Sequence, residues 1–116
     1  MITIKTNEKP SIIEVEIEGK VKENDIKEFE NYFKQKRKSQ DEINLLMSIK
    51  EIGYSFNGLI EDFKFESKYW NEFNRIAILS DKKWLEFVSK IADSLPNVEV
   101  KHFDYDEKEK AINWFA

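Results

Sequence analysis

The spacing of apolar residues along this chain switches repeatedly between a period of two and a period of about 3.6, the pattern of alternating strands and helices. Segments of strand length are expected at residues 2–4, 13–17, 43–49, 75–79 and 98–103. Helical spacing is expected over residues 23–38, 57–73, 80–95 and 104–115. The third helix is expected to be capped by residues 80–81, and the fourth by residue 104 or 106. The run at 43–49 (INLLMSI) is almost continuously apolar, which is typical of a strand covered on both faces.

These segments predict an α/β fold. Strands that alternate with helices are joined by right-handed crossovers and form a largely parallel sheet with helices on its faces. The turn-like stretch 7–10 joins the first two strands into an antiparallel hairpin. We therefore expect one domain over residues 1–116, with a single mixed, mostly parallel sheet and four helices in the order β-β-α-β-α-β-α-β-α.

Composition excludes several classes of function. The 116 residues include no cysteine and one histidine, which argues against disulfides, thiolate catalysis and zinc, and no cofactor is expected. The net charge is -4, and the basic run at 34–38 lacks interleaved aromatics, so no nucleic-acid partner is expected. That run is read as a solvated helix end, with contact to an anionic membrane surface as the alternative. The first 20 residues lack the basic start and following apolar run of a secretory signal peptide, so we expect a cytoplasmic protein.

Four segments carry a family resemblance: 19–25 (GKVKEND), 75–84 (RIAILSDKKW), 102–104 (HFD) and 111–114 (AINW). Together with the order of elements, they resemble the SpoIIAA-like family of bacterial STAS-fold proteins. The resemblance implies a STAS fold, related to the CRAL-TRIO lipid-binding fold, and it implies no catalytic activity.

One position departs from the better understood STAS proteins, the anti-sigma factor antagonists. These carry Asp-Ser-Ser-Gly-Leu-Gly at the start of the second helix, and a kinase phosphorylates the second serine. The matching residues here are 55–60 (SFNGLI), with Asn57 at the phosphoacceptor position. Asn57 can cap a helix, but it has no hydroxyl to phosphorylate. Ser55 is the alternative acceptor.

Candidate binding residues lie in the loops that follow the parallel strands, because ligands of open α/β sheets bind outside the carboxyl ends of strands. Tyr54, Ser55 and Phe56 place a hydroxyl between two aromatics, which suits a peptide or an amphipathic ligand; the alternative is a loop that plugs the core. Ser80 and Asp81 follow the next strand, where Asp81 either orients a ligand or caps a helix.

A second candidate surface is aromatic. If residues 57–73 form one helix, Phe65 and Tyr69 lie outside the apolar arc that packs on the sheet, and a partner or a lipid-like ligand would cover them. The alternatives are that a neighbouring helix buries them or that the helix breaks before Trp70.

Three expectations concern the rest of the chain. Trp84 and Leu85 are expected in the core, because they begin a regular helical stripe. His102 is expected to pack or to form a hydrogen bond at the sheet edge. Glutamates alternate along the second strand at positions 14, 16 and 18, and we expect them to be solvated and not to perturb one another.

The sequence thus predicts a non-catalytic bacterial binding or regulatory module that contacts a protein partner. The alternative is a carrier or sensor of an apolar or lipid-like small molecule, for which peripheral contact with a membrane surface is one option. The sequence does not identify the partner or the oligomeric state, and a dimer is among the states left open.

Overall fold

The computed structural model describes residues 1–50, 56–65 and 67–116. The strands are β1 (Ile2–Lys5), β2 (Ile12–Ile17), β3 (Asn44–Ile49), β4 (Arg75–Leu79) and β5 (Glu99–Phe103). The α-helices are α1 (Glu23–Arg37), α2 (Phe56–Phe63), α3 (Leu85–Ser94) and α4 (Lys108–Trp114), and 3₁₀ turns cover Lys68–Glu72, Lys82–Trp84 and Tyr105–Glu107. The predicted order of strands and helices is confirmed.

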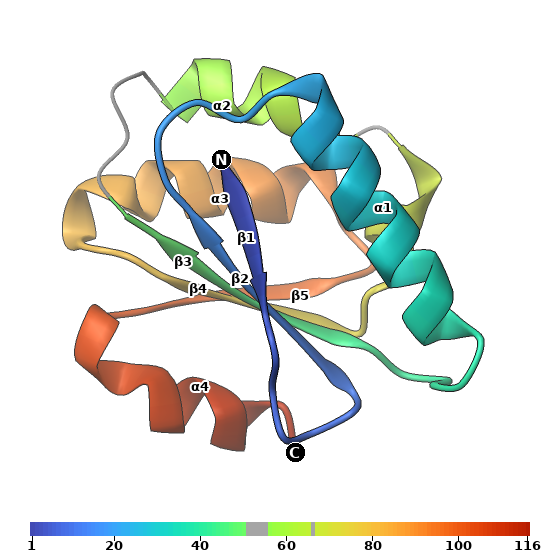
Figure 1. The fold of residues 1–116 in the computed structure, drawn as a ribbon. Coiled ribbons are helices and arrows are strands. Elements are labelled where there is room, and N and C mark those ends of the chain that lie inside the picture. Colours follow the sequence, from blue (N-terminus) through green and yellow to red (C-terminus); the bar gives the residue numbers. More distant parts are fainter. Residues whose placement is uncertain (51–55, 66) are drawn as a thin grey trace.

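The strands form one sheet in the order β1-β2-β3-β4-β5, in which β1 is antiparallel to β2 and the other pairs are parallel (Figure 1). Ile2 lies opposite Ile17, the last residue of β2, and Ile17 lies opposite Ile49, the last residue of β3. The start of the chain therefore lies at the edge where the parallel strands end, which we call the carboxyl edge. Gly19, just beyond β2, has a φ of +65°, a left-handed conformation that glycine adopts without strain.

Helices cover both faces of the sheet. Figure 1 shows α1, α2 and α3 on one side and α4 on the other. As a result all six residues of β3 are buried, as the continuous apolar run predicted.

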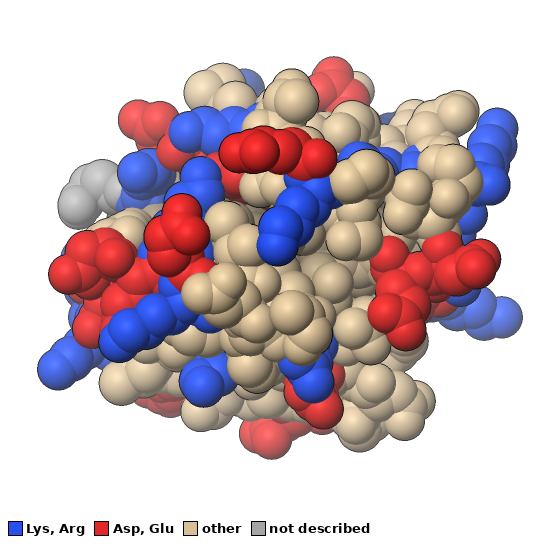
Figure 2. Space-filling model, turned by 90° about the horizontal axis from the view of Figure 1, so that it is seen from below, with Lys and Arg blue, Asp and Glu red and all other residues tan. Residues whose placement is uncertain are grey.

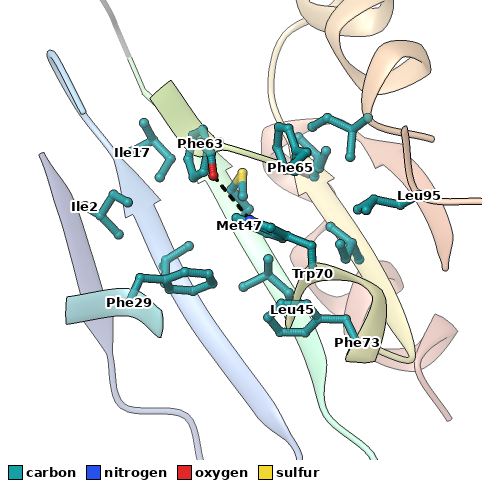
Figure 3. Close-up of a cluster of buried hydrophobic side chains, with 14 of the residues drawn as sticks. Ile2, Ile17, Phe29, Leu45, Met47, Phe63, Phe65, Trp70, Phe73 and Leu95 are labelled. Atoms are coloured by element: carbon teal, nitrogen blue, oxygen red, sulfur yellow. Dashed lines mark hydrogen bonds between the residues drawn. The ribbon is translucent and has the colours of Figure 1, made fainter. Parts of the chain in front are cut away.

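The larger core lies between the sheet and the first three helices (Figure 3). Trp70 is fully buried at its centre, with its ring 5.4 Å from the ring of Phe29. The indole Nε1 of Trp70 donates a hydrogen bond of 3.2 Å to the carbonyl of Phe63. A buried indole needs such an acceptor, and this one ties the 3₁₀ turn to the end of α2.

The prediction of one helix over residues 57–73 is wrong. The helix α2 ends at Phe63, and Lys64 has a φ of 54°, a left-handed conformation that costs a residue with a side chain about 1–2 kcal/mol. That residue turns the chain away from the helix axis, so the aromatic residues that follow no longer obey helical spacing. The helix also begins at Phe56, so Asn57 is its second residue and not the residue that precedes it.

The prediction for α3 is right for one residue and wrong for its neighbour. Trp84 is buried, as expected, but the side chain of Leu85 is 46% exposed. Residues Lys82–Trp84 form a 3₁₀ turn, and α3 starts only at Leu85. The helix then packs on the core through Phe87, Val88 and Ile91, of which Phe87 was not predicted.

A smaller apolar cluster lies between the sheet and α4. Its buried members are Ile12, Leu46, Ala77, Leu79, Phe103 and Ala111. Arg75 holds the end of the helix, because its guanidinium lies 5.2 Å from the centre of the Trp114 ring and donates a hydrogen bond to the Trp114 carbonyl.

Candidate functional site

Hydrogen bonds join the segments that follow β3, β4 and β5 at the carboxyl edge. The amide of Ser80 donates to the carbonyl of Phe103 at 3.1 Å, and Nε2 of His102 lies 3.0 Å from the carbonyl of Ser80. The hydroxyl of Tyr105 donates to the carbonyl of Ile49. The predicted hydrogen bond of His102 at the sheet edge is thus confirmed, and the edge is a connected surface.

Ser80 and Asp81 lie side by side at this edge with different exposure. Ser80 is fully buried, and its hydroxyl donates to the carbonyl of Asp81 at 3.0 Å. Asp81 is exposed, and its carboxylate accepts a hydrogen bond of 3.0 Å from the amide of Lys83. The capping role of Asp81 is therefore confirmed, and its second oxygen faces solvent with Lys83 Nζ 3.9 Å away. Ser80 shapes the turn and offers no accessible side chain.

The candidate residues of the loop after β3 are mostly outside the described structure. Tyr54 and Ser55 lie outside the described residues. For Phe56 and Asn57 the structure describes the backbone only, as the first two residues of α2. Their binding role stays a prediction.

Phe65 and Tyr69 do not form an exposed flank, which corrects the interpretation from the sequence. Their exposed fractions are 5% and 4%. The ring of Phe65 lies 4.7 Å from the ring of Trp70, and the ring of Tyr69 lies 5.8 Å from that of Phe33 on α1. The break at Lys64 returns both rings to the core, so the alternative of a broken helix with buried aromatics is the correct one.

The hydroxyl of Tyr69 has no hydrogen-bond partner among the described residues, although it is fully buried. Burial raises the pKa of this hydroxyl far above its usual value, and the nearby Glu30 carboxylate raises the pKa further. The group therefore stays protonated and neutral within the aromatic cluster.

The large apolar side chains that are most exposed among the described residues gather at the carboxyl edge. Met1, Leu85 and Tyr105 have exposed fractions of 56%, 46% and 43%. Met1 precedes β1, Leu85 opens α3, and Tyr105 follows β5, so each lies beside the end of a parallel strand. Exposed apolar side chains at one edge of a charged protein mark a surface suited to contact.

A charged groove that the sequence did not predict lies on the α4 side of the sheet. It is lined by Lys5, Glu14, Glu16, Ser48, Lys50, Leu79, Tyr105 and Lys108, and we call it the α4 groove. Its volume is about 360 Å³. Figure 2 views the molecule from this side, where acidic and basic side chains both surround an uncharged central region.

Glu14 forms one end of the α4 groove and is only 6% exposed. Its carboxylate accepts a hydrogen bond of 2.8 Å from Nζ of Lys108 on α4 and one of 2.9 Å from Nδ2 of Asn7. The expectation that this glutamate would be solvated is wrong, because α4 covers it. Two charged or polar donors satisfy the buried carboxylate.

Glu16 forms the other end of the groove with two lysines. One carboxylate oxygen lies 2.7 Å from Nζ of Lys5 and 3.7 Å from Nζ of Lys50. The hydrogen bond from Lys5 is the main reason that the pKa of Glu16 lies below its usual range, and the pKa of Lys5 is raised by the same contact. Both groups therefore remain charged at neutral pH.

Sequence reasoning missed the groove because its parts are distant along the chain. The alternation in β2 correctly placed Glu14 and Glu16 on one face of the sheet and Ile13 and Val15 on the other face. No local signal shows that Lys108, 94 residues later, would close over Glu14.

Residues 1–50, 56–65 and 67–116 contain no group of three or more His, Asp or Glu side chains that could hold a metal ion. Within the same ranges no helix is long and apolar enough to span a membrane.

Comparison with known proteins identifies the family. The SpoIIAA-like family model matches residues 12–116. A crystal structure of an uncharacterised DUF3478-family protein from Shewanella loihica PV-4, described as having a SpoIIAA-like fold, superposes with a TM-score of 0.72 and 22% sequence identity. The alignment covers 100% of this chain and 93% of that one. No curated protein matches the sequence. With its sheet order, its helices on both faces and a family match over nearly its whole length, the chain belongs to the SpoIIAA-like family.

Proposed function

We propose that this protein is a non-catalytic regulatory module of a bacterial cytoplasm, which acts by docking a protein partner at the carboxyl edge of its sheet. The observation that carries the proposal is the position of Met1, Leu85 and Tyr105, the large apolar side chains left most exposed among the described residues, at that one edge. Membership of the SpoIIAA-like family and the Shewanella loihica neighbour support the regulatory and bacterial parts of the proposal.

The edge suits a protein better than a small solute. Leu85 and Tyr105 are half-exposed, and Asp81 adds an exposed carboxylate at the same edge. Apolar anchors beside charged groups are typical of protein interfaces, in which a few large side chains carry most of the binding energy.

The alternative function is a carrier of an apolar small molecule. One observation favours it: the Tyr69 hydroxyl is buried with no hydrogen-bond partner among the described residues, and a ligand with a polar end would satisfy it. The close ring contacts of Tyr69 with Phe33 and Trp70, at 5.8 and 5.2 Å, argue against room for such a ligand.

Native mass spectrometry of the chain purified from its own cells tests the proposal. The affinity tag belongs at the carboxyl terminus, because the amino terminus lies at the docking edge and the two termini lie far apart (Figure 1). We expect a protein complex of fixed stoichiometry that is lost in Leu85→Glu. The matched control is Lys27→Glu, whose side chain is 70% exposed on α1 and which should retain the complex.

Three results would contradict the proposal. A complex that survives Leu85→Glu would exclude the carboxyl edge as the docking surface. A bound small molecule in place of a protein would support the carrier function. A homodimer that accounts for the whole complex would show that the edge serves self-association.

A further inference from the structure

The α4 groove contains a largely buried polar side chain. Ser48 on β3 is 8% exposed and lines the groove. A serine hydroxyl carries one donor and two acceptor positions. Ser48 therefore offers a hydrogen-bonding group to a molecule bound in the groove.

The charge balance of the groove favours an anion. Three lysines against two glutamates leave one net positive charge among its lining residues, in a chain whose net charge is -4. The excess lies at the Glu16 end, where Lys5 and Lys50 share a single carboxylate oxygen. Each ammonium has further protons to donate, because an ammonium carries three donors.

The adjoining hollow limits where an anion can sit. It shares Glu14 and Lys108 with the groove and adds Glu8, Lys9 and Glu109, so that glutamates outnumber lysines there. The lining charge is therefore net negative in the adjoining hollow and net positive in the α4 groove. This difference in electrostatic potential favours an anionic group at the end with Lys5 and Lys50.

The shape of the groove limits the size of the ligand. Its volume of about 360 Å³ lies at the lower end of small-molecule sites, which span roughly 300–1,000 Å³. Leu79 and the half-exposed ring of Tyr105 add apolar surface. The site has room for one anionic group with a small organic body.

We infer that the α4 groove binds a small molecule through a phosphate or carboxylate group, held by Lys5 and Lys50 and by the hydroxyl of Ser48. This site goes beyond the proposed docking function. The two surfaces share Tyr105, but Leu85, which tests docking, does not line the groove, and Ser48 and Lys50, which test the groove, are not among the docking residues.

Nuclear magnetic resonance titrations of the ¹⁵N-labelled protein test the inference. The probes are sodium phosphate and sodium succinate, each against sodium chloride at matched ionic strength. We expect saturable shifts of the Ser48 and Lys50 amides with phosphate or succinate and none with chloride. A response to phosphate alone assigns a phosphorylated ligand, and a response to succinate alone assigns a carboxylate.

Variants separate the groove from general surface charge. Lys50→Gln removes one ammonium and should raise the Kd of the binding anion about tenfold, as expected for a hydrogen bond to a charged group. Ser48→Ala should also weaken binding. The control Lys27→Gln makes the same charge change on α1, whose residues do not line the groove, and should leave the Kd unchanged. Thermal melting by circular dichroism verifies that each variant is folded.

The opposite results would overturn the inference. These are the absence of saturation with both anions, an equal loss of affinity in Lys27→Gln, or saturable binding of ethylammonium chloride at Glu16 in place of an anion.

Discussion

The ammonium of Lys108, on the last helix, lies 2.8 Å from the buried carboxylate of Glu14, on the second strand. The side chain of Glu14 is 7% exposed, whereas that of Lys108 is 49% exposed. The contact joins residues 94 positions apart and fixes α4 over one half of the sheet.

Removing the lysine should therefore destabilise the fold. We expect Lys108→Ala to lower the free energy of unfolding by about 1–3 kcal/mol, because it leaves a buried carboxylate with one donor fewer. Urea unfolding measures the loss. The control Lys110→Ala breaks an exposed pair on the same helix and should cost less than about 1 kcal/mol. Equal losses in the two variants would show that burial of Glu14 adds nothing to the contact.

Phe65 provides a test of the aromatic core. Its ring is 5% exposed and packs on Phe63 and Trp70, so Phe65→Ala should cost about 3–5 kcal/mol. Phe65→Leu keeps most of the volume and should cost less than about 1.5 kcal/mol. Chemical denaturation of both variants provides the comparison, and a loss below about 1 kcal/mol for Phe65→Ala would restore the exposed-flank interpretation.

Tyr69 should respond in the opposite way. Its hydroxyl is buried without a hydrogen-bond partner among the described residues, so Tyr69→Phe removes a desolvated polar group and keeps the ring. We expect an unchanged or higher melting temperature. A drop equivalent to about 1 kcal/mol or more would reveal a partner for the hydroxyl in solution.

Trp84 and Leu85 are neighbours with contrasting environments. Trp84→Ala should cost about 3–5 kcal/mol, because the buried ring lies edge-on to Phe87 at 5.5 Å. Leu85→Ala should change stability by no more than about 0.5 kcal/mol, as exposed positions do. Thermal melts of the two variants, measured side by side, test whether Trp84 faces the core and Leu85 faces solvent, as in the structure. A larger loss in Leu85→Ala than in Trp84→Ala would contradict this arrangement.

Glu16 makes stability depend on pH in the acid range. The hydrogen bond from Lys5 lowers its folded pKa below the ordinary value of 4.5, so its stabilising contribution is present above the unfolded pKa and is lost as pH falls through the folded pKa. A carbon-detected titration of the Glu16 carboxyl should give a midpoint below 4.5. In Lys5→Gln the midpoint should rise, and in the control Lys27→Gln it should stay where it is. An unchanged midpoint in Lys5→Gln would contradict the assignment.

Local pattern was sufficient for the order of elements and for part of the candidate site. Apolar alternation in β2 correctly placed Ile13, Val15 and Ile17 in the larger core, and the continuous apolar run of β3 correctly predicted a strand that is buried throughout. The cap formed by Asp81 is equally local, because its carboxylate binds an amide two residues away. Such features lie within one or two turns of chain, where sequence and conformation are directly linked.

What the sequence by itself determined is therefore the order of strands and helices, the mostly parallel sheet and the family to which they belong. The tertiary structure alone decided which side chains are accessible. A left-handed residue at Lys64 redirected Phe65 and Tyr69 into the core, because helical spacing holds only while the helix continues. The packing of α4 buried Glu14 and created the groove beside it, because burial depends on what covers a residue and the covering helix lies 94 residues further along the chain.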